Sequence, residues 1–79
     1  MTVRAKFVVQ SVTMTQHWDR EKGHLATIRL APVNSGSDEN KKFYEATPSG
    51  HIELGTVNQD AAAQFVLGAE IYVDFTPAV

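Results

Sequence analysis

Apolar and polar residues alternate along the start of the chain, and this pattern predicts a long β-strand. The apolar positions are Val3, Ala5, Phe7 and Val9. A two-residue period places them on one face of a strand, which we expect to be buried. The next apolar positions, Val12 and Met14, are shifted by one residue relative to this series. The shift predicts a bulge or a sharp bend around residues 10–11.

A second strand is predicted to begin at His24 and to stop at Pro32, because proline lacks the backbone N–H that regular pairing requires. Its inward residues are Ala26, Ile28 and Leu30. Between the two strands, residues 16–23 are polar and charged, and they predict a hairpin loop that contains Trp18. After the second strand, residues 34–40 are rich in turn formers and predict a solvated loop.

The segment 42–46 admits two interpretations. We expect a short strand that carries Phe43 or Tyr44 into the core, and the alternative is a helical turn that begins at Asp38. Residues 47–50, Thr-Pro-Ser-Gly, then predict a turn, because proline presets the backbone at the second position and glycine suits the fourth.

The last part of the chain predicts a strand, a helical turn and a closing strand. The first of these strands spans residues 51–57, and the closing strand ends at Phe75. Asn58 suits the N-cap of the helical turn, and we expect Gly68 to end that turn in a left-handed conformation. The residues expected to face inward are Ile52, Leu54 and Thr56 in the first strand and Ile71, Val73 and Phe75 in the second.

This order of elements fits a mainly β domain that spans residues 1–79. We expect a five-stranded barrel or roll, SH3-like or OB-like, with one short helical turn before the last strand; the helical turn favours the SH3-like arrangement by analogy. A domain of this size hides only about 60% of the surface of its unfolded chain. Since the chain has no cysteine and few candidate metal ligands, self-association or attachment to a larger assembly is expected to supply the missing stability.

Charge and hydropathy exclude some partners. The net charge is −2, so the field of the whole molecule does not attract nucleic acid or anionic lipid. No apolar run approaches the roughly 18 residues needed to span a bilayer, and the N-terminus lacks the core of a signal peptide. We therefore expect a soluble, unsecreted protein that does not act at a membrane.

Residues with catalytic or metal-binding chemistry are scattered. His17, His24 and His51 lack the spacing of preorganised metal sites, although the first two could meet across the hairpin loop. The chain has no cysteine and no strand-elbow serine motif for nucleophilic catalysis. Four loop carboxylates are expected only to solubilise the chain: Asp19, Glu21, Asp38 and Glu39. The sequence therefore predicts no enzyme activity, no metal site and no cofactor.

Basic and aromatic residues form the candidate interaction surface. They are Arg4, Lys6, Trp18, Arg29, Lys41, Lys42 and Tyr72. Arg4, Lys6 and Arg29 should point outward from the first two strands, and a basic strip beside aromatic rings is one way to hold single-stranded nucleic acid. The simpler interpretation, which we favour, is that these cations keep strand edges from pairing.

Trp18 is a large aromatic residue in an otherwise hydrophilic loop. Indole rings are enriched where proteins contact partners, so Trp18 is a candidate contact residue. The alternative is that it folds back and plugs the mouth of the barrel.

Five short segments carry a likeness to known proteins. They are residues 4–7 with 11–13, Glu39-Asn40 before Phe43, residues 46–50, and Gly68 with residues 72–78. Together they resemble a family of small, largely uncharacterised proteins encoded by tailed bacteriophages, with insertions after Thr15 and Val33. The most specific piece is Tyr-Val-Asp-Phe-Thr-Pro-Ala at 72–78, and Ile71 departs from the family, where a second aromatic residue is expected. The resemblance implies a phage origin but assigns no catalytic or ligand residue.

The resemblance and the lack of reactive groups predict a non-enzymatic phage protein. We expect a small virion component that decorates or stabilises the head, with capsid subunits or copies of itself as partners, in the virion or the host cytoplasm. One alternative is a soluble binder, made during infection, of single-stranded nucleic acid or host signalling nucleotides. The other is an inhibitor that docks on a host defence enzyme through an edge strand.

Overall fold

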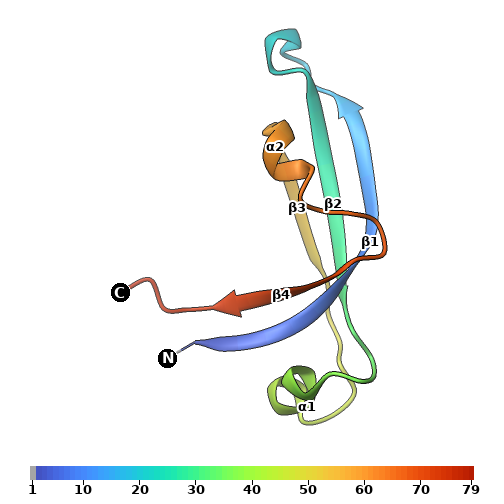
Figure 1. The fold of residues 1–79 in the computed structure, drawn as a ribbon. Helices are drawn as coiled ribbons and strands as arrows, with labels where there is room; N and C mark the ends of the chain where they lie inside the picture. Colours follow the sequence, from blue (N-terminus) through green and yellow to red (C-terminus); the bar gives the residue numbers. More distant parts are fainter. Residues whose placement is uncertain (1) are drawn as a thin grey trace.

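The computed structural model describes residues 2–79, in which four strands and three short helices are formed. The strands are β1 (Val3–Gln16), β2 (His24–Pro32), β3 (Ile52–Thr56) and β4 (Glu70–Phe75). The helices are the 3-10 turn η1 (Arg20–Lys22), α1 (Asp38–Tyr44) and α2 (Gln59–Ala62). The strands form one antiparallel sheet in the order β3-β2-β1-β4 (Figure 1). None of the helices in this part of the chain is long and apolar enough to cross a membrane.

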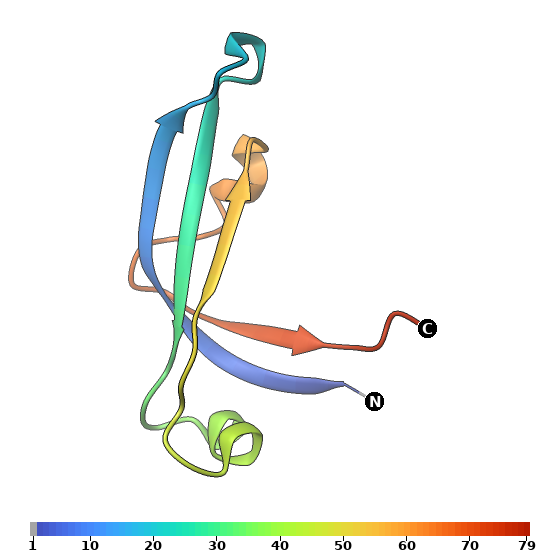
Figure 2. The same ribbon diagram turned by 180° about the vertical axis from the view of Figure 1, so that it is seen from behind.

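Strand β1 is bent, and its two halves have different partners. Residues 3–8 pair with β4, whereas residues 7–16 pair with β2. At the bend, Val9 pairs with Leu30 and Ser11 with Arg29, so Gln10 is the extra residue of a bulge. The bulge predicted from the shift in apolar phase is confirmed. Figures 1 and 2 show the result: the β1–β2 hairpin extends in one direction, and the start of β1 with β4 extends in another.

The hydrophobic core lies within this bend. Its strand residues are Ala5, Phe7, Val9, Ala26, Ile28 and Leu30, all of them buried as the alternation predicts. Five partly buried residues pack against them, namely Val12, Ile52, Phe65, Ile71 and Val73. Helix α2 contributes the buried Ala62, and its predicted N-cap is confirmed, because Asn58 Oδ1 accepts a hydrogen bond of 3.0 Å from the Ala61 N–H.

Residues 42–46 do not form the expected strand. They lie in and just after α1, which begins at Asp38, the start given by the alternative interpretation. The Ser37 hydroxyl accepts a hydrogen bond of 3.2 Å from the Asn40 N–H and so caps the helix. Acidic residues in the first turn and lysines in the last turn complement the helix dipole. These capping signals outweigh the strand preference of the two aromatic residues in the segment.

The sheet is open and does not close into the expected five-stranded barrel. Without a strand at 42–46, β3 pairs only with β2, and β4 pairs only with β1, among the residues described. The fold is therefore mainly β, as expected, but it has four strands and two free sheet edges.

Gly68 does not end α2, because that helix stops at Ala62. It is left-handed as expected, with a φ of 84°. Its N–H donates to the carbonyl of Val9 at 2.9 Å, and the Val9 N–H donates to the Ala69 carbonyl at 2.9 Å. Gly68 therefore forms the turn that brings the chain alongside β1 at the bulge.

Candidate functional site

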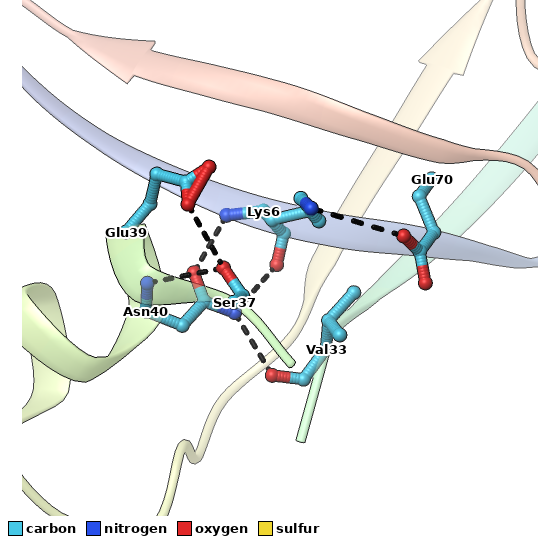
Figure 3. A network of polar contacts seen from close by, with 6 residues as sticks. All are labelled: Lys6, Val33, Ser37, Glu39, Asn40 and Glu70. Atoms are coloured by element: carbon cyan, nitrogen blue, oxygen red, sulfur yellow. Dashed lines mark hydrogen bonds and ion pairs between the residues drawn. The ribbon is translucent and has the colours of Figure 1, made fainter. Parts of the chain in front are cut away.

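Asn40 joins helix α1 to the sheet. Its side chain is almost fully buried, with 2% of the residue exposed, and it makes three hydrogen bonds to backbone groups (Figure 3). Asn40 Oδ1 accepts from the Lys6 N–H at 2.6 Å, and Nδ2 donates to the carbonyls of Lys6 and Val33 at 2.8 and 2.9 Å. Beyond the end of β2, the Asn40 side-chain amide thus forms the hydrogen bonds to the Lys6 backbone that a residue of a neighbouring strand would otherwise form.

Sequence reasoning did not identify this role of Asn40. The available signal was the spacing Ser37-x-x-Asn40, which is the spacing of a helix cap and its third residue. That spacing predicts the cap but gives no indication that the asparagine side chain reaches back to Lys6, 34 positions earlier.

Three residues of the predicted interaction surface meet on the outer face of β1 and β4. The Arg4 guanidinium lies 4.7 Å and the Lys6 ammonium 5.5 Å from the centre of the Tyr72 ring. Arg4 also binds Asp74 through two hydrogen bonds of 2.6 and 3.0 Å, and Lys6 Nζ lies 4.0 Å from a Glu70 carboxylate oxygen. The cations are therefore partly neutralised by carboxylates on the neighbouring strand.

The charges of this cluster shift the pKa of its members. The hydrogen bond from Arg4 lowers the pKa of Asp74, and the hydrogen bond with Asp74 raises the pKa of Arg4. Hydrogen bonds to its own backbone amide and to the Tyr72 hydroxyl lower the pKa of Glu39. Both carboxylates are thus held in the charged form beside the two basic side chains.

The other predicted basic residues lie apart from this cluster. Arg29 is on β2, where Arg29 Nε bonds to Glu53 Oε1 on β3 at 2.5 Å. Lys41 and Lys42 lie in the last turn of α1. Lys42 lines a depression of about 440 Å³ together with Arg4 and four other residues. The predicted strip is therefore interrupted, and each of its three strand cations faces a carboxylate within 4.0 Å.

Trp18 lies at the tip of the β1–β2 hairpin and is 88% exposed. The prediction that it plugs the mouth of a barrel is wrong, because the sheet is open and the ring points into solvent. The loop around it is braced: the Asp19 N–H donates to His17 Nδ1 at 2.9 Å, and the His17 N–H donates to the Gly23 carbonyl at 3.0 Å. The His17 ring lies 5.1 Å from the Trp18 ring, centre to centre. The tip therefore presents the indole from an ordered turn.

The three histidines do not gather into a metal site. Within residues 2–79, no group of three or more His, Cys, Asp or Glu side chains is placed to hold a metal ion. His17 and His24 do lie on opposite sides of the hairpin, where Gln16 pairs with His24.

The chain exposes a large surface for its size. Its accessible area is 5854 Å², whereas a compact monomer of 8.7 kDa exposes about 4,700 Å². Its radius of gyration is 14.5 Å, against about 12 Å for a compact chain of this length. The large exposed apolar residues are Val3, Met14, Trp18, Phe43, Leu54, Val66, Leu67, Tyr72, Phe75 and Val79. The excess, about 1,100 Å², is comparable to one side of a protein interface, about 800 Å².

Comparisons with known proteins give no relative: no protein-family model, curated protein or solved structure matches this chain.

Proposed function

We propose that this protein is a non-enzymatic assembly protein, a small structural component of a phage virion that binds to the head and stabilises it. The observation that carries the proposal is the surface of 5854 Å², about 1,100 Å² more than a compact monomer of this mass exposes. An excess of accessible surface on this scale, together with the ten large apolar residues exposed within residues 2–79, is typical of a chain that is covered by a partner. The virion as the location rests on the likeness of residues 72–78 and the other segments to phage-encoded proteins.

Trp18 is the residue that we propose inserts into the head subunit. An aromatic side chain held by an ordered turn loses little conformational entropy on binding, and such residues commonly dominate binding energy. Trp18 is the most exposed aromatic residue in the chain, and Asp19, His17 and Gly23 hold its loop in place.

The test is the protein content of purified virions. Mass spectrometry should detect this chain in virions that carry the wild-type gene. The variant Trp18→Ala should be lost from virions while its thermal midpoint stays within about 3 °C of wild type, since exposed substitutions usually change stability by no more than about 0.5 kcal/mol. Lys22→Ala, in the same loop, is the matched control and should be retained. Virions without wild-type protein would overturn the proposal, and retention of Trp18→Ala would overturn the role of the indole.

A binder of single-stranded nucleic acid or nucleotides is the second candidate. It is favoured by the two cations over the Tyr72 ring, which resembles a stacking platform. Nucleic-acid binding is disfavoured by Asp74 and Glu70, because their carboxylates already pair with Arg4 and Lys6. Fluorescence anisotropy with labelled oligonucleotides and cyclic nucleotides at low salt separates the two candidates, because the assembly protein should show no saturable binding.

A further inference from the structure

The outer edge of β4 carries free backbone groups. The Lys6 N–H and carbonyl bond to Asn40 and Val33, on the side of β1 away from β4. The pair of Lys6 with Tyr72 is therefore a non-hydrogen-bonded pair of the antiparallel ladder. It follows that the backbone N–H and carbonyl groups of Glu70, Tyr72 and Asp74 point away from β1, toward the free edge.

This edge lacks most of the devices that protect strand edges in monomers. β4 contains no lysine, no proline and no bulge, all of which commonly block pairing. Asp74, which could repel another strand, is held by Arg4.

Helix α1 packs mainly against β1, and α2 packs against β2 and β3. The α1 side chain of Phe43 reaches Phe75 of β4, with 5.9 Å between the ring centres. However, α1 approaches from the side of β1, where Asn40 binds Lys6, and leaves the outer backbone edge of β4 uncovered. The edge is open to another strand along its six residues.

We propose that β4 pairs antiparallel with β4 of a second copy of this chain, with Val73 of the two copies on the two-fold axis. In this register Tyr72 lies opposite Asp74 of the other copy, and the outward backbone groups of these residues bond to each other. On the core face, Ile71 lies opposite Phe75 of the other copy, so the apolar residues of both strands form one continuous row.

Charge selects this register over its neighbours. An axis at Tyr72 would place Glu70 opposite Asp74, and like charges directly opposite each other destabilise a ladder. An axis at Ile71 would place Asp74 beyond the end of the second strand and leave Phe75 uncovered. The axis at Val73 avoids opposed carboxylates and covers Phe75, which is 45% exposed in the single chain. A standard interface buries about 800 Å² from each partner, and the excess surface of the chain, about 1,100 Å², is of this order.

The absence of cysteine from the chain permits a direct test by disulfide cross-linking. Opposed residues of a non-hydrogen-bonded pair have Cα atoms about 4.5 Å apart, within the range that a disulfide spans. Oxidation of Val73→Cys with copper phenanthroline should therefore give a covalent dimer. Ile71→Cys is the matched control, on the same face of the same strand, and should stay monomeric because its two copies would lie about 14 Å apart. A dimer from Ile71→Cys and none from Val73→Cys would overturn the register.

A second pair of variants tests the edge without cysteine. Tyr72→Pro removes an N–H that the single chain does not use and so should fold but remain monomeric. Tyr72→Ala loses the same ring but keeps the N–H and should still dimerise. Light scattering after gel filtration should give about twice 8.7 kDa for wild type and Tyr72→Ala, and 8.7 kDa for Tyr72→Pro. A wild-type monomer at high micromolar concentration would overturn the dimer.

These outcomes are independent of the virion proposal. The dimer uses β4, whereas the proposed contact with the head uses Trp18 in the loop that joins β1 to β2. Figure 1 shows this loop at the end of the hairpin far from β4. If the protein dimerises but is absent from virions, only the proposed function is overturned. If it is monomeric but present in virions, only the dimer is overturned.

Discussion

A single buried amide, Asn40, holds helix α1 against β1, and its removal should be costly. Asn40→Ala deletes three hydrogen bonds and leaves the backbone groups of Lys6 and Val33 without their side-chain partner. We expect a loss of about 2–4 kcal/mol in the free energy of unfolding, measured by urea denaturation. Asn34→Ala, an exposed position near the same helix, is the control and should change stability by no more than about 0.5 kcal/mol. Equal effects of the two variants would contradict the role of Asn40.

Asp74 should make the free energy of unfolding decrease at acidic pH. Its pKa is lowered in the folded state by the hydrogen bond from Arg4, so the unfolded chain binds its proton more readily. The stabilisation is present above the unfolded pKa of about 3.9 and is lost as the pH falls through the lower folded pKa. Urea unfolding between about pH 5 and pH 2 should show a shallower decline for Asp74→Asn, and for Arg4→Gln, than for wild type. A decline as steep as that of wild type in both variants would show that the pair does not contribute.

The contrast between these residues shows what the sequence could predict. Burial of Phe7, Val9 and Ile28 was predictable because the alternation of apolar and polar residues along a strand can be read from the local sequence alone. The position of Asn40 was not, because its partners are backbone groups that any residue would offer, and only the folded chain brings them together. The meeting of Arg4, Lys6 and Tyr72 was partly predictable, since all three were expected on outer faces, but the carboxylates beside them depend on the pairing of β1 with β4.

The secondary structure of residues 42–46 determines whether the sheet can close into a barrel. Their aromatic residues suit a strand, but the Ser37 cap and the charges of the flanking turns favour a helix, and the helix removes the strand that a five-stranded barrel needs. The mainly β class was predictable from the other strands. The closure of the sheet was not, because it depended on one short segment whose local signals conflict.

Helix α1 ends at a position where a different residue should increase stability. Glu45 follows the helix in the left-handed conformation, with a φ of 58°, which costs a residue with a Cβ atom about 1–2 kcal/mol. Glu45→Gly removes this cost and loses part of the gain to the greater entropy of the unfolded chain. We expect a net gain of about 0.5–1 kcal/mol by urea denaturation. Glu45→Ala keeps the Cβ atom and should show no gain; a loss of stability in Glu45→Gly would contradict the argument.

The β4–β4 dimer that we propose would make the stability of the protein depend on its concentration. A single copy has a radius of gyration of 14.5 Å and leaves both sheet edges open, so part of its stability is expected to come from the second copy. For a dimer that unfolds to two chains, a tenfold rise in concentration adds about 1.4 kcal/mol per dimer. Given the unfolding entropy expected for a chain of this length, the thermal midpoint of the wild type should rise by about 3–5 °C.

Calorimetry at 10-fold spaced concentrations, on the order of 10 µM to 1 mM, measures this dependence. Tyr72→Pro should unfold at one temperature throughout, because it cannot donate the edge hydrogen bond, while Tyr72→Ala should keep the wild-type slope. A flat wild-type midpoint over this range would mean that the open sheet is stable by itself. Phe75, which is 45% exposed in the single chain, would then remain uncovered in solution.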